Sequence, residues 1–330
     1  MKIDIRKVAE KAEVSIATVS RSLNDSGSVS KKTKDKVLAA AQELGYRHNS
    51  IASSLRSKRS SFIGLLVPDV DNEFFSSLAS AIEQSILQVG FSLFLCNTME
   101  DEEIEKRYVE SLLDNQVMGI ILVSAGMKSH PRIVRKNTPV VFVDRVGADL
   151  AIPNRVVIES DNEKGGALAA EALLARGAQR FVFLGDQRNM QAMRNRERGF
   201  ADYLRANAVA AANYHREVIP VSAAAARAKV RTIYETFPFD GIFCGTDLIA
   251  LGAMRGLADL GLSMPTDVQL IGFDGIRVGE FTIPALSTIR QNVERMGKIA
   301  AESIMRMITG DQSGETIILP VDFVARETTK

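Results

Sequence analysis

Acidic residues close several apolar runs in this sequence. Asp69, Asp144, Asp247 and Asp274 end the runs FIGLLVPD, PVVFVD, GIFCGTD and LIGFD. Ligands of parallel α/β sheets gather at the carboxyl ends of the strands, where a carboxylate makes charge-assisted hydrogen bonds. These acids therefore predict a small-molecule site. Two other interpretations stay open: Asp69 and Asp247 as helix caps, and Asp144 and Asp274 as plain surface acids.

Residues suited to catalysis or metal binding are scarce. The three histidines, His48, His130 and His215, have neither an H-x-x-x-H spacing nor a cysteine partner. Cys96 and Cys244 lie inside apolar runs, which indicates buried free thiols. The chain contains no G-x-x-x-x-G-K-[ST] phosphate loop and no G-x-S-x-G nucleophile elbow. We therefore expect no metal and no cofactor, and an α/β enzyme acting on sugars is the weakest hypothesis.

Three short helical patterns precede the apolar runs. The first, DIRKVAEKA, begins with Asp4 as its N-cap, and the second begins at Ser15 after a turn of only a few residues. The third runs from Thr33 to a stop at Gly45, with apolar residues including Leu38 at helical spacing. Two short helices joined by so tight a turn and braced by a third predict a helix-turn-helix unit.

The second of these helices, SIATVSRSLN, has an unusually flat outer side. Val19 and Leu23 lie four residues apart and face inward, so that only Ile16 and Arg21 project among small outer side chains. A helix-turn-helix unit places its second helix in the major groove of DNA. Small residues permit close approach there, arginine pairs with guanine, and isoleucine packs on a thymine methyl group. The alternative is a helix packed against the rest of the protein.

The charges are unevenly divided along the chain. Residues 1–60 contain 13 Lys and Arg against 6 Asp and Glu, whereas the rest contain 28 against 34. A basic head suits a polyanionic partner, because cations near phosphates release condensed counterions. The stretch NSIASSLRSKRSS at 49–61 has weak helical spacing and is too short to be stable alone. It predicts a helix that folds only against a partner.

The composition is that of a soluble globular protein, with 46% hydrophobic and 25% charged residues. No apolar run reaches the roughly 18 residues that suggest a membrane span. The N-terminal segment MKIDIRKVAEKAEV lacks the continuous apolar region of a secretory signal. We therefore expect a cytoplasmic protein without a membrane partner.

From Ser61 onward, apolar runs alternate with amphipathic helical patterns. Helices are expected at 73–88, 102–115, 162–175, 196–206, 223–235, 247–259 and 293–308, with a connection near 160 and closing strands near 316–325. Such alternation indicates parallel sheets with helices on both faces. The pair MGIILVSA and PVVFVDR echoes the pair FDGIFCGTD and VQLIGFDG. The fold class predicted is therefore a small all-α head and an α/β core of two doubly wound lobes.

Taken together, these motifs resemble the LacI/GalR family of bacterial transcription repressors over the whole chain. The segments VAEKAEVSIATVSRSLN, VSKKTKDKVLAAAQELGY and NSIASSLRSKRSSFIGLLVPDVDNEFF are followed in order by VDR, RERGF, DLIALGA, LIGFDG and PALSTIRQNVERMG. The resemblance implies a helix-turn-helix domain at 1–48, a hinge helix and linker at 49–60, and a periplasmic-binding-protein-like core at 61–330. The core would divide into an N-lobe (61–159 and 291–317) and a C-lobe (160–290 and 318–330).

The resemblance also implies DNA contacts. Ile16, Ala17 and Arg21 match base-reading positions, and Leu55 matches a leucine that is wedged into the minor groove and kinks the duplex. The other matched DNA-binding positions are Ser15, Thr18, Ser20, Asn24, Asn49 and Ser54. Glu13 departs from the family, whose tight turn often carries glycine at this point, so a strained turn is expected. The implied partner is pseudo-palindromic double-stranded operator DNA, bound by a homodimer.

A small effector bound between the lobes is the remaining implication. The matched effector positions are Asn72, Phe74, Phe75, Asp144, Arg145, Arg196, Asp247, Asp274 and Gln291. Carboxylates and guanidinium groups bond to adjacent hydroxyls while aromatic faces cover C–H groups, which favours a sugar or a sugar phosphate. A nucleobase or a phosphorylated carrier-protein corepressor remains an alternative. A sugar-binding module without a DNA function is the other, although such a module would not need residues 1–60.

Overall fold

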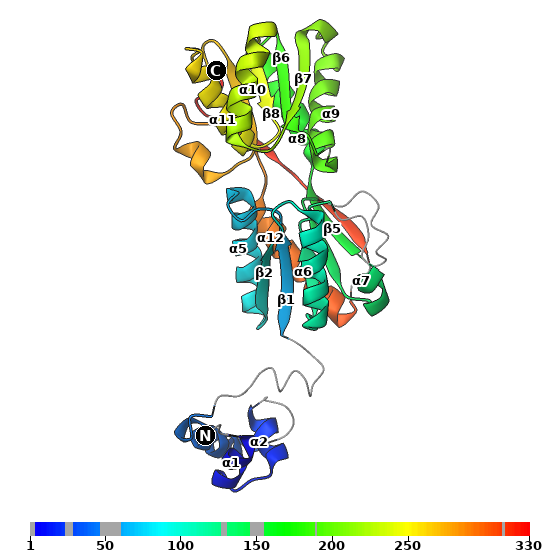
Figure 1. Ribbon diagram of the computed structural model, residues 1–330, viewed down its shortest axis with the longest axis vertical. Coiled ribbons are helices and arrows are strands. Elements are labelled where there is room, and N and C mark those ends of the chain that lie inside the picture. Colours follow the sequence, from blue (N-terminus) through cyan, green and yellow to red (C-terminus); the bar gives the residue numbers. More distant parts are fainter. Residues whose placement is uncertain are drawn as a thin grey trace. The chain divides into compact units, whose positions relative to one another are not determined.

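The chain folds as two compact units, Met1–Arg59 and Ser60–Lys330, which we call the head and the core (Figure 1). The computed structural model describes residues 4–23, 29–46, 61–126, 131–145, 155–188, 190–311 and 314–330. The expectations for Asn24 and for the hinge residues Asn49, Ser54 and Leu55 lie outside the described residues.

Three helices pack together in the head: α1 (Ile5–Lys11), α2 (Ile16–Leu23) and α3 (Lys31–Glu43). They bury a common apolar cluster made of Val8, Ala9, Ala12, Val19, Val37, Ala40 and Ala41. The third helix begins two residues before the predicted Thr33, because the Ser30 hydroxyl accepts a hydrogen bond from the Thr33 N–H at 3.2 Å. Leu38, expected to face inward, is 44% exposed because its neighbour Val37 takes the inward position.

The turn between α1 and α2 has the backbone conformation expected from the family comparison. Glu13 lies in the left-handed region with φ +50°, where a side chain costs about 1–3 kcal/mol of strain. The Lys36 ammonium donates a hydrogen bond to Glu13 at 2.6 Å and lowers the pKa of that carboxyl. The Ser15 hydroxyl caps α2 by accepting from the Thr18 N–H at 3.1 Å, whereas Asp4 stands at the N-cap of α1 without a side-chain bond.

The first lobe of the core is built on a sheet of six parallel strands in the order β11-β5-β4-β3-β1-β2. Its strands are β1 (Phe62–Val67), β2 (Ser92–Asn97), β3 (Gly119–Leu122), β4 (Val140–Val143), β5 (Arg155–Ser160) and β11 (Glu315–Leu319). Its helices are α5 (Glu73–Gln88), α6 (Glu102–Asp114), α7 (Pro131–Lys136) and α12 (Val293–Thr309). The sequence pattern predicts neither β5 nor α7.

The second lobe repeats this plan with the order β12-β10-β9-β8-β6-β7, in which only the β10–β12 pair is antiparallel. Its strands are β6 (Phe181–Asp186), β7 (Tyr214–Ile219), β8 (Gly241–Cys244), β9 (Gln269–Asp274), β10 (Ser287–Arg290) and β12 (Asp322–Val324). Its helices are α8 (Asn162–Ala175), α9 (Gln191–Ala206), α10 (Ala223–Thr236) and α11 (Asp247–Asp259), with short 3-10 turns η1 (Ala211–Asn213) and η2 (Arg277–Glu280). The predicted two-lobed α/β fold class is confirmed.

Three segments connect the lobes: β5 to α8, β10 to α12, and β11 to β12 (Figure 1). The first two are tied together by side chains, because the Ser160 hydroxyl donates to Gln291 at 2.6 Å. The Gln291 amide then donates to the carboxylate of Asp274 at 2.9 Å. The ends of β5, β9 and β10 are thereby joined at the junction between the lobes.

Candidate functional site

The head presents the predicted DNA-binding residues on one side of α2. Ser15, Ile16, Ala17 and Arg21 are exposed, Ile16 to 41% despite its apolar side chain. Thr18 and Ser20 are half-buried on the same helix. The Arg21 side chain donates through Nε to the Ala17 carbonyl at 3.3 Å, which holds the guanidinium against its own helix. Ser15, Ile16, Ala17 and Arg21 are therefore accessible at the start and on the outer side of α2, whereas Thr18 and Ser20 are only partly accessible.

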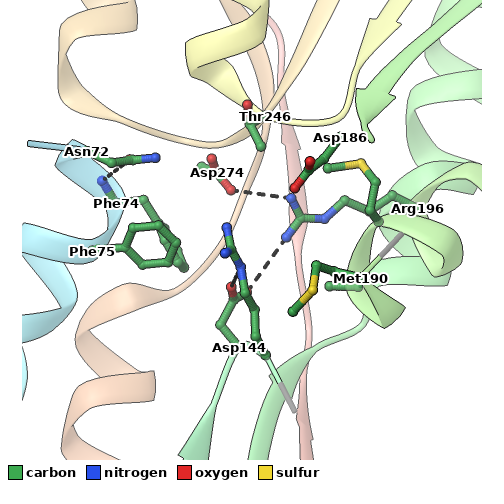
Figure 2. A pocket seen from close by; sticks show the side chains of 12 residues that line it. Asn72, Phe74, Phe75, Asp144, Asp186, Met190, Arg196, Thr246 and Asp274 are labelled. Atoms are coloured by element: carbon green, nitrogen blue, oxygen red, sulfur yellow. Dashed lines mark hydrogen bonds and ion pairs between the residues drawn. The ribbon is translucent and has the colours of Figure 1, made fainter. Parts of the chain in front are cut away.

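A pocket lies between the two lobes of the core (Figure 2). Its N-lobe wall comes from the start of α5 and the end of β4, and its C-lobe wall from the ends of β6, β8 and β9 and the start of α9. The lining residues are Asn72, Phe74, Phe75, Asp144, Arg145, Asp186, Met190, Ala192, Met193, Arg196, Thr246 and Asp274. Of the four predicted strand-end acids, Asp144 and Asp274 line the pocket, whereas Asp69 and Asp247 do not.

Arg196 is the centre of this pocket, and it reaches across it. Its guanidinium lies 3.7 Å from a carboxylate oxygen of Asp144 in the N-lobe and 3.6 Å from one of Asp274 in the C-lobe (Figure 2). It also donates to Asn162 and to the Gly245 carbonyl, each at 2.8 Å. Burial lowers the pKa of Arg196, while the two carboxylates favour its charged form. A cation so tightly held is preorganised to donate to a ligand.

Two glycines allow α9 to carry Arg196 so close to α8. A Cβ on Gly166 would lie 2.0 Å from the Arg196 carbonyl oxygen, and a Cβ on Gly199 would lie 1.9 Å from that of Glu163. Any side chain at either position would force the helices apart, because such contacts lie far inside van der Waals distance. The motif RERGF therefore contains both the guanidinium and the glycine that sets its depth.

The N-lobe wall combines an aromatic surface with an arginine. The Phe74 and Phe75 rings pack edge to face with centroids 5.2 Å apart, and the Arg145 guanidinium lies 4.8 Å from the centroid of the Phe75 ring. Asn72 caps α5, with its side-chain oxygen accepting from the Phe74 N–H at 3.0 Å. Asp69 does not cap this helix, since it accepts from the Asp71 N–H instead.

Asp247 and Gln291 lie behind the pocket and not in its lining. The buried Asp247 carboxylate accepts from the N–H groups of Gly275 and Ile276 at 2.8 and 2.9 Å, and from the Thr288 hydroxyl at 2.7 Å. It therefore fixes the chain after β9. Burial and the charge of Asp274 raise the pKa of Asp247, and burial and the charge of Asp144 raise the pKa of Asp274.

Sequence reasoning missed five lining residues: Asp186, Met190, Ala192, Met193 and Thr246. Asp186 carries the same signal as the predicted acids, since it ends the apolar run RFVFLGD. The two methionines gave no comparable signal, because an apolar residue near a helix start has the same pattern whether it faces the core or a ligand.

The described residues contain no cluster of three or more His, Cys, Asp or Glu side chains able to hold a metal ion. None of the described helices is long and apolar enough to cross a membrane.

Comparison with known proteins accounts for both units. Residues 4–49 match the model for bacterial regulatory proteins of the lacI family, and residues 60–327 match that for periplasmic binding proteins and the sugar-binding domain of the LacI family. A ribose operon repressor from Halalkalibacterium halodurans is 36% identical, covering 99% of this chain and 97% of the relative. A sucrose operon repressor from Lactococcus lactis subsp. lactis is also 36% identical, covering 97% and 98%.

A solved structure agrees with these relatives. The Lac repressor dimer bound to operator and the anti-inducer ONPF superposes with a TM-score of 0.87 at 28% identity, covering 100% of this chain and 99% of that one. The family predicted from the motifs is thus confirmed from the head to the end of the core. The chain belongs to the LacI family of bacterial regulatory proteins.

Proposed function

We propose that this protein is a homodimeric transcription repressor whose affinity for operator DNA is set by a small neutral sugar bound between the core lobes. The observation that carries the proposal is the position of Arg196, which lies between a carboxylate of each lobe. A ligand that exchanges hydrogen bonds with these groups contacts both lobes at once. Its binding therefore favours one relative arrangement of the lobes over others, which is the requirement for allosteric control.

The head supports the DNA-binding half of the proposal. Ile16, Ala17 and Arg21 project from α2 and are the base-reading residues we assign, with Ser15, Thr18 and Ser20 beside phosphates. In the stretch that the structure does not describe, Asn24, Asn49, Ser54 and Leu55 complete the proposed interface. The proposed division is a head at 1–48, a hinge at 49–60 and a core at 61–330.

The pocket chemistry favours a sugar. The carboxylates of Asp144, Asp186 and Asp274 accept hydrogen bonds and Arg145 and Arg196 donate them, which matches the alternating needs of neighbouring hydroxyls. Phenylalanine rings on the N-lobe side and methionines on the C-lobe side offer apolar surface to the C–H groups of a ring.

The charge of the lining favours a neutral sugar over a sugar phosphate. Its three carboxylates outnumber its two guanidinium groups, and each guanidinium already lies within 4 Å of a carboxylate. A phosphate would bring additional negative charge to a site whose cations are already balanced. A nucleobase finds apolar walls here, but its few polar atoms leave several of these charged groups unpaired. The names of the relatives contain ribose and sucrose, and we favour a single ring of the ribose type over a disaccharide. Arg196 lies within 4 Å of a carboxylate of each lobe, which narrows the space left for a ligand between the lobes.

Exposed apolar side chains support the homodimer. Leu87, Val89, Phe94 and Leu95 are 40–56% exposed on the last turn of α5 and on the edge strand β2. In the C-lobe, Phe281 and Ile283 are 77% and 97% exposed. Apolar surface of this kind is typical of subunit interfaces. We assign both patches to contact with a second copy of the chain. We also propose that the dimer acts in the cytoplasm and has no catalytic activity.

The test combines two measurements on the full chain. Thermal shift against pentoses, hexoses, disaccharides, sugar phosphates and nucleobases identifies the ligand class, and fluorescence anisotropy with an operator selected from random DNA measures the effect of that ligand. We expect a neutral monosaccharide to stabilise the protein and to weaken operator binding, which is induction. Stabilisation by a nucleobase alone, or by sugar phosphates alone, contradicts the proposed ligand class. Absence of any sequence-selective DNA binding contradicts the repressor function.

A further inference from the structure

A chain of four alternating charges crosses the space between the lobes beside the pocket. Arg145 and Glu100 belong to the N-lobe, and Arg188 and Asp186 belong to the C-lobe. Arg145 donates to both carboxylate oxygens of Glu100, at 3.1 and 3.0 Å. Arg188 pairs with the same Glu100 carboxylate and donates through Nε to Asp186 at 2.8 Å. The contact between Glu100 and Arg188 is the point where this chain passes from one lobe to the other.

Both partners at the crossing point are held in their charged forms. Burial by itself would raise the pKa of Glu100, but the two guanidinium groups outweigh it and keep that pKa below its ordinary value. Burial likewise opposes the charge on Arg188, and Glu100 and Asp186 outweigh it and raise its pKa. Their side chains are 26% and 25% exposed, so water and salt reach the contact.

The four charges form one neutral pair in each lobe. When the lobes separate, Glu100 keeps Arg145 and Arg188 keeps Asp186, so that only the contact between the pairs is lost. A buried charge left without a partner would strongly oppose such a movement, and none of these four charges is left in that state. The Glu100–Arg188 contact can therefore open and close with the lobes.

Each end of the chain of charges is a wall of the pocket. The Arg145 guanidinium lies 4.8 Å from the centroid of the Phe75 ring. The Asp186 carboxylate also accepts a hydrogen bond from the backbone N–H of Arg188, at 3.0 Å. Arg145 and Asp186 line the pocket, whereas Glu100 and Arg188 lie behind them. Closure of the contact thus fixes the position of one donor of the N-lobe relative to one acceptor of the C-lobe at the pocket.

We propose that Glu100 and Arg188 are positioning residues for the effector, forming an electrostatic clasp between the lobes that strengthens effector binding without touching the ligand. The inference rests on the proposed function, since it assigns the clasp to the same sugar pocket. A neutral sugar has no charge for salt to screen. Any loss of sugar affinity at high ionic strength must therefore come from the protein, and the clasp is a partly exposed interlobe ion pair beside the site.

The first test is a double-mutant cycle on the full chain, with the dissociation constant of the sugar found by thermal shift measured by calorimetry. Glu100→Gln and Arg188→Gln are each expected to weaken binding about fivefold, and the double variant no more than either one. Raising NaCl from about 0.05 to about 0.5 M increases the screening of charges that solvent reaches. The affinity of the wild type for the sugar should then fall, and that of the double variant should not. Asp202→Asn and Arg205→Gln form the control, because this exposed pair lies within α9 of the C-lobe and links no other element.

Additive losses in the cycle, or an equal salt dependence in wild type and double variant, would overturn the clasp. A second measurement does not depend on the ligand. Hydrogen exchange of the ligand-free chain should increase in the double variant in the loops after β2 and β6, and stay unchanged in the control pair. If no sugar binds, the ligand assignment fails while this exchange result still decides the clasp: unchanged exchange in both loops removes it.

Discussion

Replacement of Gly199 by alanine tests how the helix packing positions the pocket. The new Cβ would lie 1.9 Å from the Glu163 carbonyl oxygen and 3.1 Å from the Ala167 nitrogen, both backbone atoms of α8. Neither can rotate away, so α9 must move from α8 by at least ~1 Å. Overpacking of this kind costs about 1–3 kcal/mol of unfolding free energy. For a lobe of this size, that corresponds to a fall in Tm of about 2–4 °C for each kcal/mol.

The same displacement should weaken effector binding beyond its effect on stability. Arg196 lies one helical turn before Gly199, and its Nε–Asn162 bond of 2.8 Å links the two helices that move. Hydrogen bonds of charged groups contribute about 1.5–3 kcal/mol, and each 1.4 kcal/mol is about tenfold in affinity. We therefore expect the Kd for the sugar to rise at least about tenfold, measured by calorimetry well below the Tm of the variant.

Gly256→Ala is the matched control. Its Cβ would lie 2.4 Å from Val230 and 2.6 Å from the Arg227 carbonyl oxygen, so it strains the packing of α10 on α11 in the same lobe. It should lower the Tm without the loss of affinity, because that contact lies ten residues beyond the pocket residue Thr246. If Gly199→Ala lowers the Tm as the control does and still binds the sugar like wild type, the α8–α9 spacing does not position Arg196.

Three further outcomes are expected. Arg21→Ala should weaken operator binding by about 1–3 kcal/mol and relax the preference at one base pair, and an unchanged profile over randomised operators would contradict the assignment. Leu55→Ala should reduce affinity for the operator far more than for random DNA, and equal losses on both would exclude a wedge. Because the native pKa values of Asp247 and Asp274 are raised, the folded chain holds more protons than the unfolded chain above about pH 4. The urea midpoint of unfolding should thus decrease between pH 5 and pH 8, and it should decrease less in Asp274→Asn. An equal decrease in wild type and variant would show that Asp247 and Asp274 do not cause the pH dependence.

Long apolar runs made the central strands predictable, whereas strands defined by their neighbours were not. RFVFLGD and GIFC are buried on both faces, which leaves a continuous apolar signal in the sequence. β7 lies at a sheet edge with Arg216 exposed, and β10 has the sequence STIR, which contains a single apolar residue. β5, with the sequence RVVIES, is recognisable as a strand only once β4 and β11 flank it. Pairing partners distant in the chain decide these segments, and periodicity does not contain that information.

The start of α9 illustrates the same limit for the site. The pattern predicts a helix from Arg196, whereas α9 begins at Gln191. The pattern misses the first turn because a buried arginine occupies a position where apolar residues normally mark the inward face of a helix. Arg196 can be buried only because Asp144, Asp274 and Asn162 approach it from three other segments. A local pattern cannot reveal those partners, although the motif resemblance did select the residue.

The position of Asp247 shows why a strand-end acid is not always a ligand contact. Thr246 caps α11, so Asp247 falls at the first helical position, and its carboxylate turns back toward the chain after β9. Asp274 instead has φ +121° and lines the pocket opposite Arg196. Asp247 therefore holds the backbone of the residues that follow Asp274, and Gln291 holds the Asp274 side chain at the lobe junction. A ligand that accepts a bond from Arg196 or donates one to Asp274 is thereby coupled directly to the segments that connect the lobes, which is the path by which the pocket can influence their arrangement.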